Sequence, residues 1–120
     1  MMISFIPIEQ GNIIGIEIDG KIETSDIEQM IAIVEEKLKS HKPLRAYVQV
    51  KSLGGVSLEG LLEDLKFALR HLNDFEKKAV VCELSWLTKI ATVSSKLFPS
   101  IEVKCFSWSE QEQAIAWIKN

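Results

Sequence analysis

The stretch IIGIEIDG at residues 13–20 decides the fold, because it predicts a strand that pairs with the segment before it and precedes the alternating helices and strands after it. Its β-branched isoleucines favour an extended strand, and Asp19 with Gly20 supplies turn residues at its end. Upstream, Ile3 and Phe5 alternate with other positions, and residues 10–12 (QGN) form a turn signal. Residues 3–18 therefore predict two short strands around a tight turn, most simply antiparallel to each other.

After residue 20 the apolar pattern alternates between helical and extended periods. Ser25 and Glu28 have the spacing of a capping box, which predicts the start of a helix that ends before Pro43. A second box, Ser109 with Glu112, predicts the start of the last helix. Between them the patterns predict strands over 44–50, 78–83 and 101–105, and helices over 58–72 and 85–97.

The resulting order is β-β-α-β-α-β-α-β-α. Strands that alternate with helices favour right-handed crossovers and a parallel sheet covered by helices. The fold class predicted is α/β, with a mostly parallel, five-stranded mixed sheet and four helices. No internal repeat or linker interrupts residues 1–120, so we expect a single domain.

Composition excludes several classes of protein. The 120 residues are 47% hydrophobic and 26% charged, which is typical of a globular domain and not of a disordered chain. A net charge of −3 provides no basic field for a nucleic acid. The N-terminus has no basic start to an apolar run, and no uncharged stretch approaches the length of a membrane span. We expect a cytoplasmic protein.

The chain resembles the SpoIIAA-like family of the STAS superfamily, whose fold is also similar to CRAL-TRIO lipid-transfer domains. The resemblance covers nearly the whole chain, and the segments that carry it are Ile18–Ile22, Lys78–Val81, Trp86, Glu102–Phe106 and the ending around Trp117. It implies a small cytoplasmic α/β domain. Members of the superfamily act in regulatory protein contacts, and the lipid-transfer branch holds apolar ligands.

The resemblance also points to Ser57. STAS anti-sigma-factor antagonists carry an Asp-Ser pair at the matching helix start, where the serine is phosphorylated, but Val56 stands here in the acidic position. The residue pattern alone favours a helix cap for Ser57, and a phosphate there would meet the positive end of the helix dipole. Gly54 and Gly55 before it suit a permissive strand-to-helix turn, and their backbone N–H groups could also cradle a phosphate.

Two tryptophans mark the edge where parallel strands end. Trp86 and Trp108 each follow a predicted strand, and ligands of open α/β sheets bind outside that edge. They either close the core or bound an apolar site together with Leu53 and Val56. Trp117 lies beside the apolar stripe of the last helix and is expected to pack there.

The titratable residues favour structural roles. Cys82 and Cys105 fall inside predicted strands, where cysteines usually act as small apolar side chains. His41 and His71 lie near helix ends, away from the expected ligand edge. Asp19 and Glu83 each end a predicted strand and could converge at the ligand-binding edge of the sheet. The favoured roles are a turn residue for Asp19 and a solvated carboxylate for Glu83. No catalytic, metal or cofactor motif is found, so none is predicted.

Two functions follow as alternatives. The first is a non-enzymatic, STAS-like module that engages a protein partner or a second copy of itself. Ile33 and Phe67 support an interface, because both are apolar and lie off the main helical stripes. The second is a carrier of a small, lipid-like apolar ligand in a pocket at the carboxyl edge of the sheet.

Overall fold

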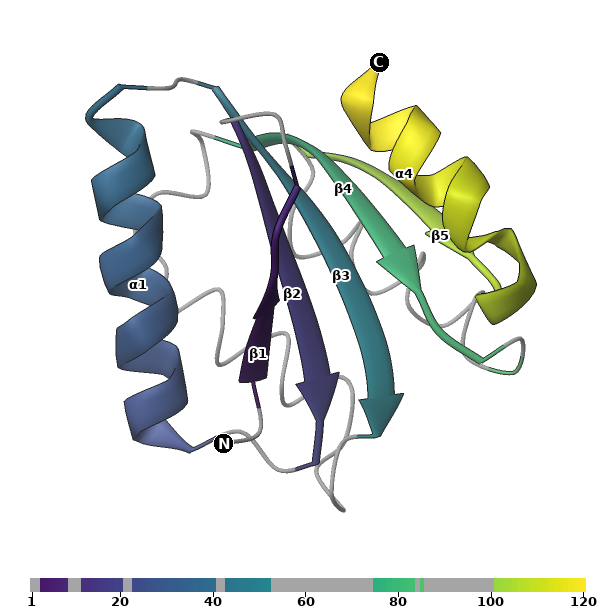
Figure 1. Cartoon of the computed structure of the whole chain (residues 1–120), viewed down its shortest axis with the longest axis horizontal. Helices are drawn as coiled ribbons and strands as arrows, with labels where there is room; N and C mark the ends of the chain where they lie inside the picture. Colours follow the sequence, from purple (N-terminus) through teal and green to yellow (C-terminus); the bar gives the residue numbers. More distant parts are fainter. Residues whose placement is uncertain are drawn as a thin grey trace.

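Five strands and two α-helices make up the described part of this computed structural model (Figure 1). The structure describes residues 3–8, 12–20, 23–40, 43–52, 75–83, 85 and 101–120. In chain order the elements are β1 (Ile3–Ile6), β2 (Ile13–Asp19), α1 (Thr24–Leu38), β3 (Leu44–Ser52), β4 (Phe75–Val81), β5 (Glu102–Phe106), the short 3-10 helix η3 (Trp108–Glu110) and α4 (Gln111–Lys119).

The strands form one sheet in the order β1-β2-β3-β4-β5, so each strand lies beside the strand before it in the sequence. β1 is antiparallel to β2, and the other neighbouring pairs are parallel. In register, Val48 of β3 lies beside Val80 of β4, and Val80 lies beside Cys105 of β5. The predicted α/β class and the mostly parallel, five-stranded mixed sheet are confirmed.

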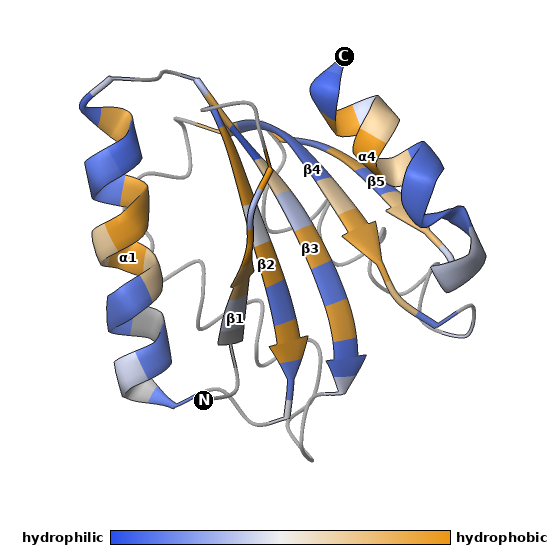
Figure 2. Cartoon of the chain, in the orientation of Figure 1, coloured by the Kyte–Doolittle hydropathy of each residue, from blue (hydrophilic) through white to orange (hydrophobic). Residues whose placement is uncertain are grey.

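Side chains that alternate along the strands divide the core between the two faces of the sheet. Ile14, Ile16 and Ile18 of β2 pack in one cluster with Met30 and Val34 of α1. The opposite face holds a second cluster, which α4 covers; its buried members are Ile13, Tyr47, Ala79, Val81, Phe106, Ala114 and Ile118. Figure 2 shows the alternation as successive hydrophobic and hydrophilic bands along β3.

Helix α1 begins earlier than the sequence pattern indicates. The expected capping box of Ser25 and Glu28 is wrong, since both residues are exposed and lie inside the helix. The observed box joins Glu23 and Asp26: the Glu23 N–H donates to Asp26 Oδ2 at 2.9 Å. Asp26 is only 4% exposed, so its carboxylate has left water and takes the backbone hydrogen bond in exchange.

The box expected at Ser109 and Glu112 is also displaced by two residues. Glu110 accepts hydrogen bonds from the Ser107 N–H at 2.9 Å and from the Ser107 hydroxyl at 3.0 Å. This box caps η3, and α4 continues from it at Gln111. A 3-10 turn inserted before the helix therefore moves the start signal upstream.

Two of the four expected helices are present among the described residues, as α1 and α4. The other two, over 58–72 and 85–97, lie outside the described residues apart from Ser85. A total of four helices remains a prediction from the apolar stripes.

Candidate functional site

Most of the site predicted at the carboxyl edge of the sheet lies outside the described residues. This holds for its apolar and glycine positions, for the possible phosphorylation site and for one interface residue: Leu53, Gly54, Gly55, Val56, Ser57, Trp86 and Phe67. Their roles remain predictions. Trp108 and Ile33 are described.

Trp108 begins η3, two residues after β5 ends, and so lies at the carboxyl edge. It is half-buried and packs against the cluster that contains Phe106 and Ala114. Trp117 of α4 packs on the same cluster, with its ring centroid 6.2 Å from that of Phe106. The Lys77 ammonium lies 4.7 Å from the Trp117 ring centroid, which adds a cation–π contact.

Asp19 and Glu83 share the carboxyl edge but belong to strands that are not neighbours. Asp19 Oδ1 accepts a hydrogen bond from Ser52 Oγ at 3.1 Å, and Glu83 is exposed two residues beyond β4. Because β3 lies between β2 and β4, two strand spacings of about 4.8 Å separate their backbones. In the part of the chain that the structure describes, no group of three or more His, Cys, Asp or Glu side chains could hold a metal ion.

The cysteines lie in the core, as their strand positions predict. Cys82 is fully buried directly after β4, and burial raises the pKa of its thiol to about 12, with further contributions from Cys105 and Glu83. Cys105 is half-buried in β5, and burial also raises the pKa of its thiol. A raised pKa keeps both thiols protonated near neutral pH, and a protonated thiol is a poor nucleophile.

Lys78 lies on β4 on the same face as these thiols, since its register partner is Val103 and Val80 is the partner of Cys105. Burial lowers the pKa of Lys78 to about 8, and the nearby Cys105 opposes this shift. Loss of hydration disfavours the ammonium form, which explains the direction. Lys78 is therefore partly neutral in mildly alkaline solution. It lies on the face of the sheet that carries the cluster with Met30 and Val34.

A cavity of about 260 Å³, open to solvent on one side, lies between β1, the beginning of β2 and the second half of α1. Its lining consists of Phe5–Ile8, Ile13–Gly15, Ile33 and Lys37. Ile33, which was expected at an interface, is thus one wall of this cavity. Because β2 begins at residue 13, the cavity lies at the amino end of the parallel strands, opposite the edge where the sequence predicts a ligand.

Gly15 explains how β1 comes so close to β2 beside this cavity. A Cβ atom placed on Gly15 would lie 2.4 Å from the backbone oxygen of Ile6, its register partner. The sequence contains the signal, because a lone glycine inside a β-branched strand marks a close backbone approach. Lys37 had no comparable signal: its helical position alone does not reveal which strands lie opposite.

No described helix is long and apolar enough to cross a membrane. No curated protein matches the sequence. A solved structure that does match is an uncharacterized protein with a SpoIIAA-like fold from Shewanella loihica PV-4, with a TM-score of 0.68 and 23% identity over 97% of this chain and 91% of that one. The SpoIIAA-like family model matches residues 13–119. With nearly all of its sheet and both described helices inside that match, the chain belongs to the SpoIIAA-like family.

Proposed function

We propose that this chain is a non-enzymatic, STAS-like binding module of the cytoplasm, acting as a single domain, and that its partner is a second copy of itself. The observation that carries the proposal is the edge strand β1, which contains no charged residue. The family supports a role in protein contacts, since members of the wider superfamily act through them.

The two edges of the sheet differ in their protection. Edge strands attract other strands, and proteins usually block them with charged side chains. β5 carries Glu102 and Lys104, both exposed, and η3 and α4 follow it directly. β1 has the sequence ISFI, with an exposed Ser4 and no charge. β1 is therefore the edge better suited to pair with another strand.

A second copy suits this edge by symmetry. Two β1 strands related by a two-fold axis run antiparallel to each other, so the same residues serve both sides of the contact. Such pairing would join two five-stranded sheets into one continuous sheet. Phe5 and Ile6 are both half-buried, and pairing would bury more of their apolar surface away from water.

The test is the oligomeric state of the wild type and of Ser4→Lys, measured by analytical ultracentrifugation over a range of concentrations. We expect a dimer for the wild type and a monomer for Ser4→Lys, because lysine protects edge strands. The variant should stay folded, since Ser4 lies beside Glu17 and a lysine there gains a cross-strand ion pair.

The matched control is Ala116→Lys, which adds the same charge to an exposed position of α4, on the helix that packs against β3, β4 and β5. It should remain a dimer. A wild type that stays monomeric at every concentration would contradict the proposal, and so would a Ser4→Lys variant that dimerises as the wild type does.

The alternative function is a carrier of a small apolar ligand at the carboxyl edge. It is supported by the half-buried Trp108 at that edge. Mass spectrometry of the protein in its native state tests it: a co-purified apolar molecule that is lost in Trp108→Ala would support this carrier. Phosphorylation of Ser57 likewise stays a proposal, to be tested by phosphopeptide mapping.

A further inference from the structure

The cavity beneath β1 is a second candidate site, independent of the proposed self-association. From its lining we infer that it binds a short saturated carboxylate, with the aliphatic tail between β1, β2 and Ile33 and the carboxylate at Lys37. This site lies at the opposite end of the strands from the carboxyl edge predicted from the sequence.

The lining determines the chemistry of the tail. Among the described residues of the lining, every one except Lys37 is apolar or glycine, from Phe5–Ile8, Ile13–Gly15 and Ile33. Apolar cavities of about 150 Å³ hold a molecule as small as benzene, and drug-sized ligands need about 300 Å³ or more. A volume of about 260 Å³ lies between these and suits a short chain of methylenes.

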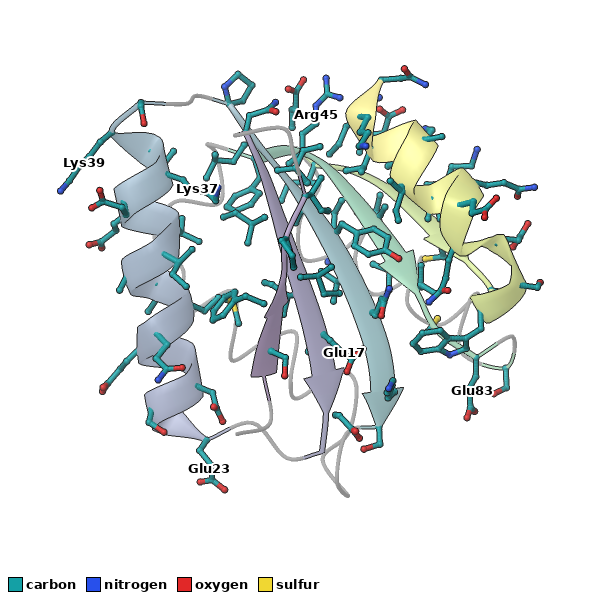
Figure 3. All side chains as sticks on the ribbon, viewed as in Figure 1. Glu17, Glu23, Lys37, Lys39, Arg45 and Glu83 are labelled. Atoms are coloured by element: carbon teal, nitrogen blue, oxygen red, sulfur yellow. The ribbon has the colours of Figure 1, made fainter. Side chains whose placement is uncertain are left out.

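Lys37 determines the chemistry of the head. It is the one charged residue among the described residues of the lining, and Figure 3 shows it on the side of α1 that faces the strands. Its ammonium has three donors, so it can bind a carboxylate while it keeps another contact. Lys39, two residues later, extends from the opposite side of α1 and bonds to Glu36 at 3.1 Å.

Gly15 keeps the cavity wall in place. Because its missing side chain lets the Ile6 backbone approach, β1 is held against β2 at its last residue, next to Pro7. Phe5 faces the α1 side of the sheet with Ile14 and Ile16, whereas Ile6 shares the other face with Ile13. The cavity therefore lies around the end of an edge strand, where a ligand can enter without displacing either of the described helices, α1 and α4.

The experiment is a titration with butanoate, hexanoate and octanoate, followed by the amide NMR signals of the full chain. We expect saturable shifts near residues 5–8, 13–15 and 33–37. Affinity should rise by about four-fold per added methylene until the cavity is full, which is the gain expected for burying one methylene group. Ile33→Trp fills the cavity and should abolish the shifts.

The head group is tested by a matched pair of lysine variants. Lys37→Met keeps the aliphatic stem and removes the charge, so octanoate should bind about five-fold more weakly while octanol binds as before. Lys39→Met removes a charge two residues away, outside the lining, and should leave both ligands unaffected.

Three results would overturn the inference. The first is that none of the three acids gives saturable shifts. The second is that a folded Ile33→Trp variant still binds octanoate. The third is that Lys37→Met and Lys39→Met change octanoate binding equally. Ser4 does not line the cavity, so Ser4→Lys should still bind octanoate. A failed dimer and a failed ligand site are therefore distinguishable.

Discussion

Gly15 in β2 holds β1 in place through the side chain that it lacks. A Cβ atom at this position would lie 2.4 Å from the Ile6 oxygen and 3.0 Å from the Ile6 Cβ, so Gly15→Ala must push β1 away. We expect a loss of about 1–3 kcal/mol in the free energy of unfolding, the usual cost of overpacking. Urea denaturation of the two proteins measures it.

The second substitution that sharpens this prediction is Ile6→Ala. The closest atom to the added methyl group is a backbone oxygen, which a shorter side chain does not remove. Ile6→Ala/Gly15→Ala should therefore be less stable than Gly15→Ala. A double variant that regains the stability of Ile6→Ala alone would contradict the prediction, because alanine at position 6 keeps both the backbone oxygen and the Cβ atom that the added methyl group meets.

Single residues also show where sequence reasoning succeeds. Burial of Cys82 and packing of Trp117 follow from their places in an apolar strand and beside an apolar stripe. The place of Ile33 beside the cavity does not follow, because an apolar residue off the main stripe suits an interface as well as a cavity wall, and its predicted interface role stays a prediction. Deciding between them requires the position of β1, which a helical pattern does not contain.

At the scale of the element, the box of Ser107 and Glu110 starts the C-terminal helical segment. Hydrogen bonds from the Ser107 backbone and hydroxyl lower the pKa of the Glu110 carboxyl below its ordinary value of 4.5. A carboxyl group whose pKa is lowered by folding stabilises the protein at pH values above its ordinary pKa. This contribution is lost as the pH falls through the lowered pKa.

Glu110→Gln should accordingly lower the melting temperature at pH 7, and the difference from the wild type should shrink as the pH falls below 4.5. Thermal unfolding followed by circular dichroism across that range measures it. The control is Glu112→Gln, which removes an exposed charge from the first turn of α4. An equal loss in both variants, at every pH, would mean that net charge and not the box is responsible.

Elements were more predictable than their ends. The change of hydrophobic period located β2, α1, β3 and α4 correctly, because burial on one face constrains every second or every third to fourth residue. Both capping boxes were placed two residues too late. The motif tolerates several acidic partners, and Glu23 with Asp26 competes with Ser25 and Glu28 for the same helix start.

At the scale of the whole molecule, the order of the strands and the division of the core between the two faces of the sheet determine where the cavity lies. The antiparallel β1 and the parallel β2–β5 agree with the strand directions predicted from the alternation of strands and helices, whereas the order β1-β2-β3-β4-β5 was not predicted from the sequence. The cavity could not be predicted in this way. It depends on the distance between α1 and the end of β1, which is set by packing and not by the sequence pattern.

Arg45 joins three elements of this arrangement, and its loss is the sharpest test of how α4 is held. From β3, its Nη1 donates to the Ile118 carbonyl oxygen of α4 at 2.8 Å, and its Nε donates to Glu76 Oε2 of β4 at 3.1 Å. The carbonyl belongs to the last turn of α4, where unpaired carbonyl groups carry the negative end of the helix dipole.

Arg45→Met should lower the free energy of unfolding by about 1.5–3 kcal/mol, the range for hydrogen bonds to charged groups. Urea denaturation measures this global loss. Hydrogen exchange should also show faster opening of the α4 amides than of the β2 and β3 amides, because the lost contact belongs to α4.

Glu76→Gln separates the two contacts of Arg45. The Glu76 side chain is 39% exposed, so the ion pair alone should contribute no more than about 1 kcal/mol. Arg45→Lys should lie between Arg45→Met and the wild type, because one ammonium replaces the two-pronged guanidinium. If Glu76→Gln were as damaging as Arg45→Met, the ion pair would carry the stabilisation, and α4 would depend on its apolar contacts through Ala114 and Ile118.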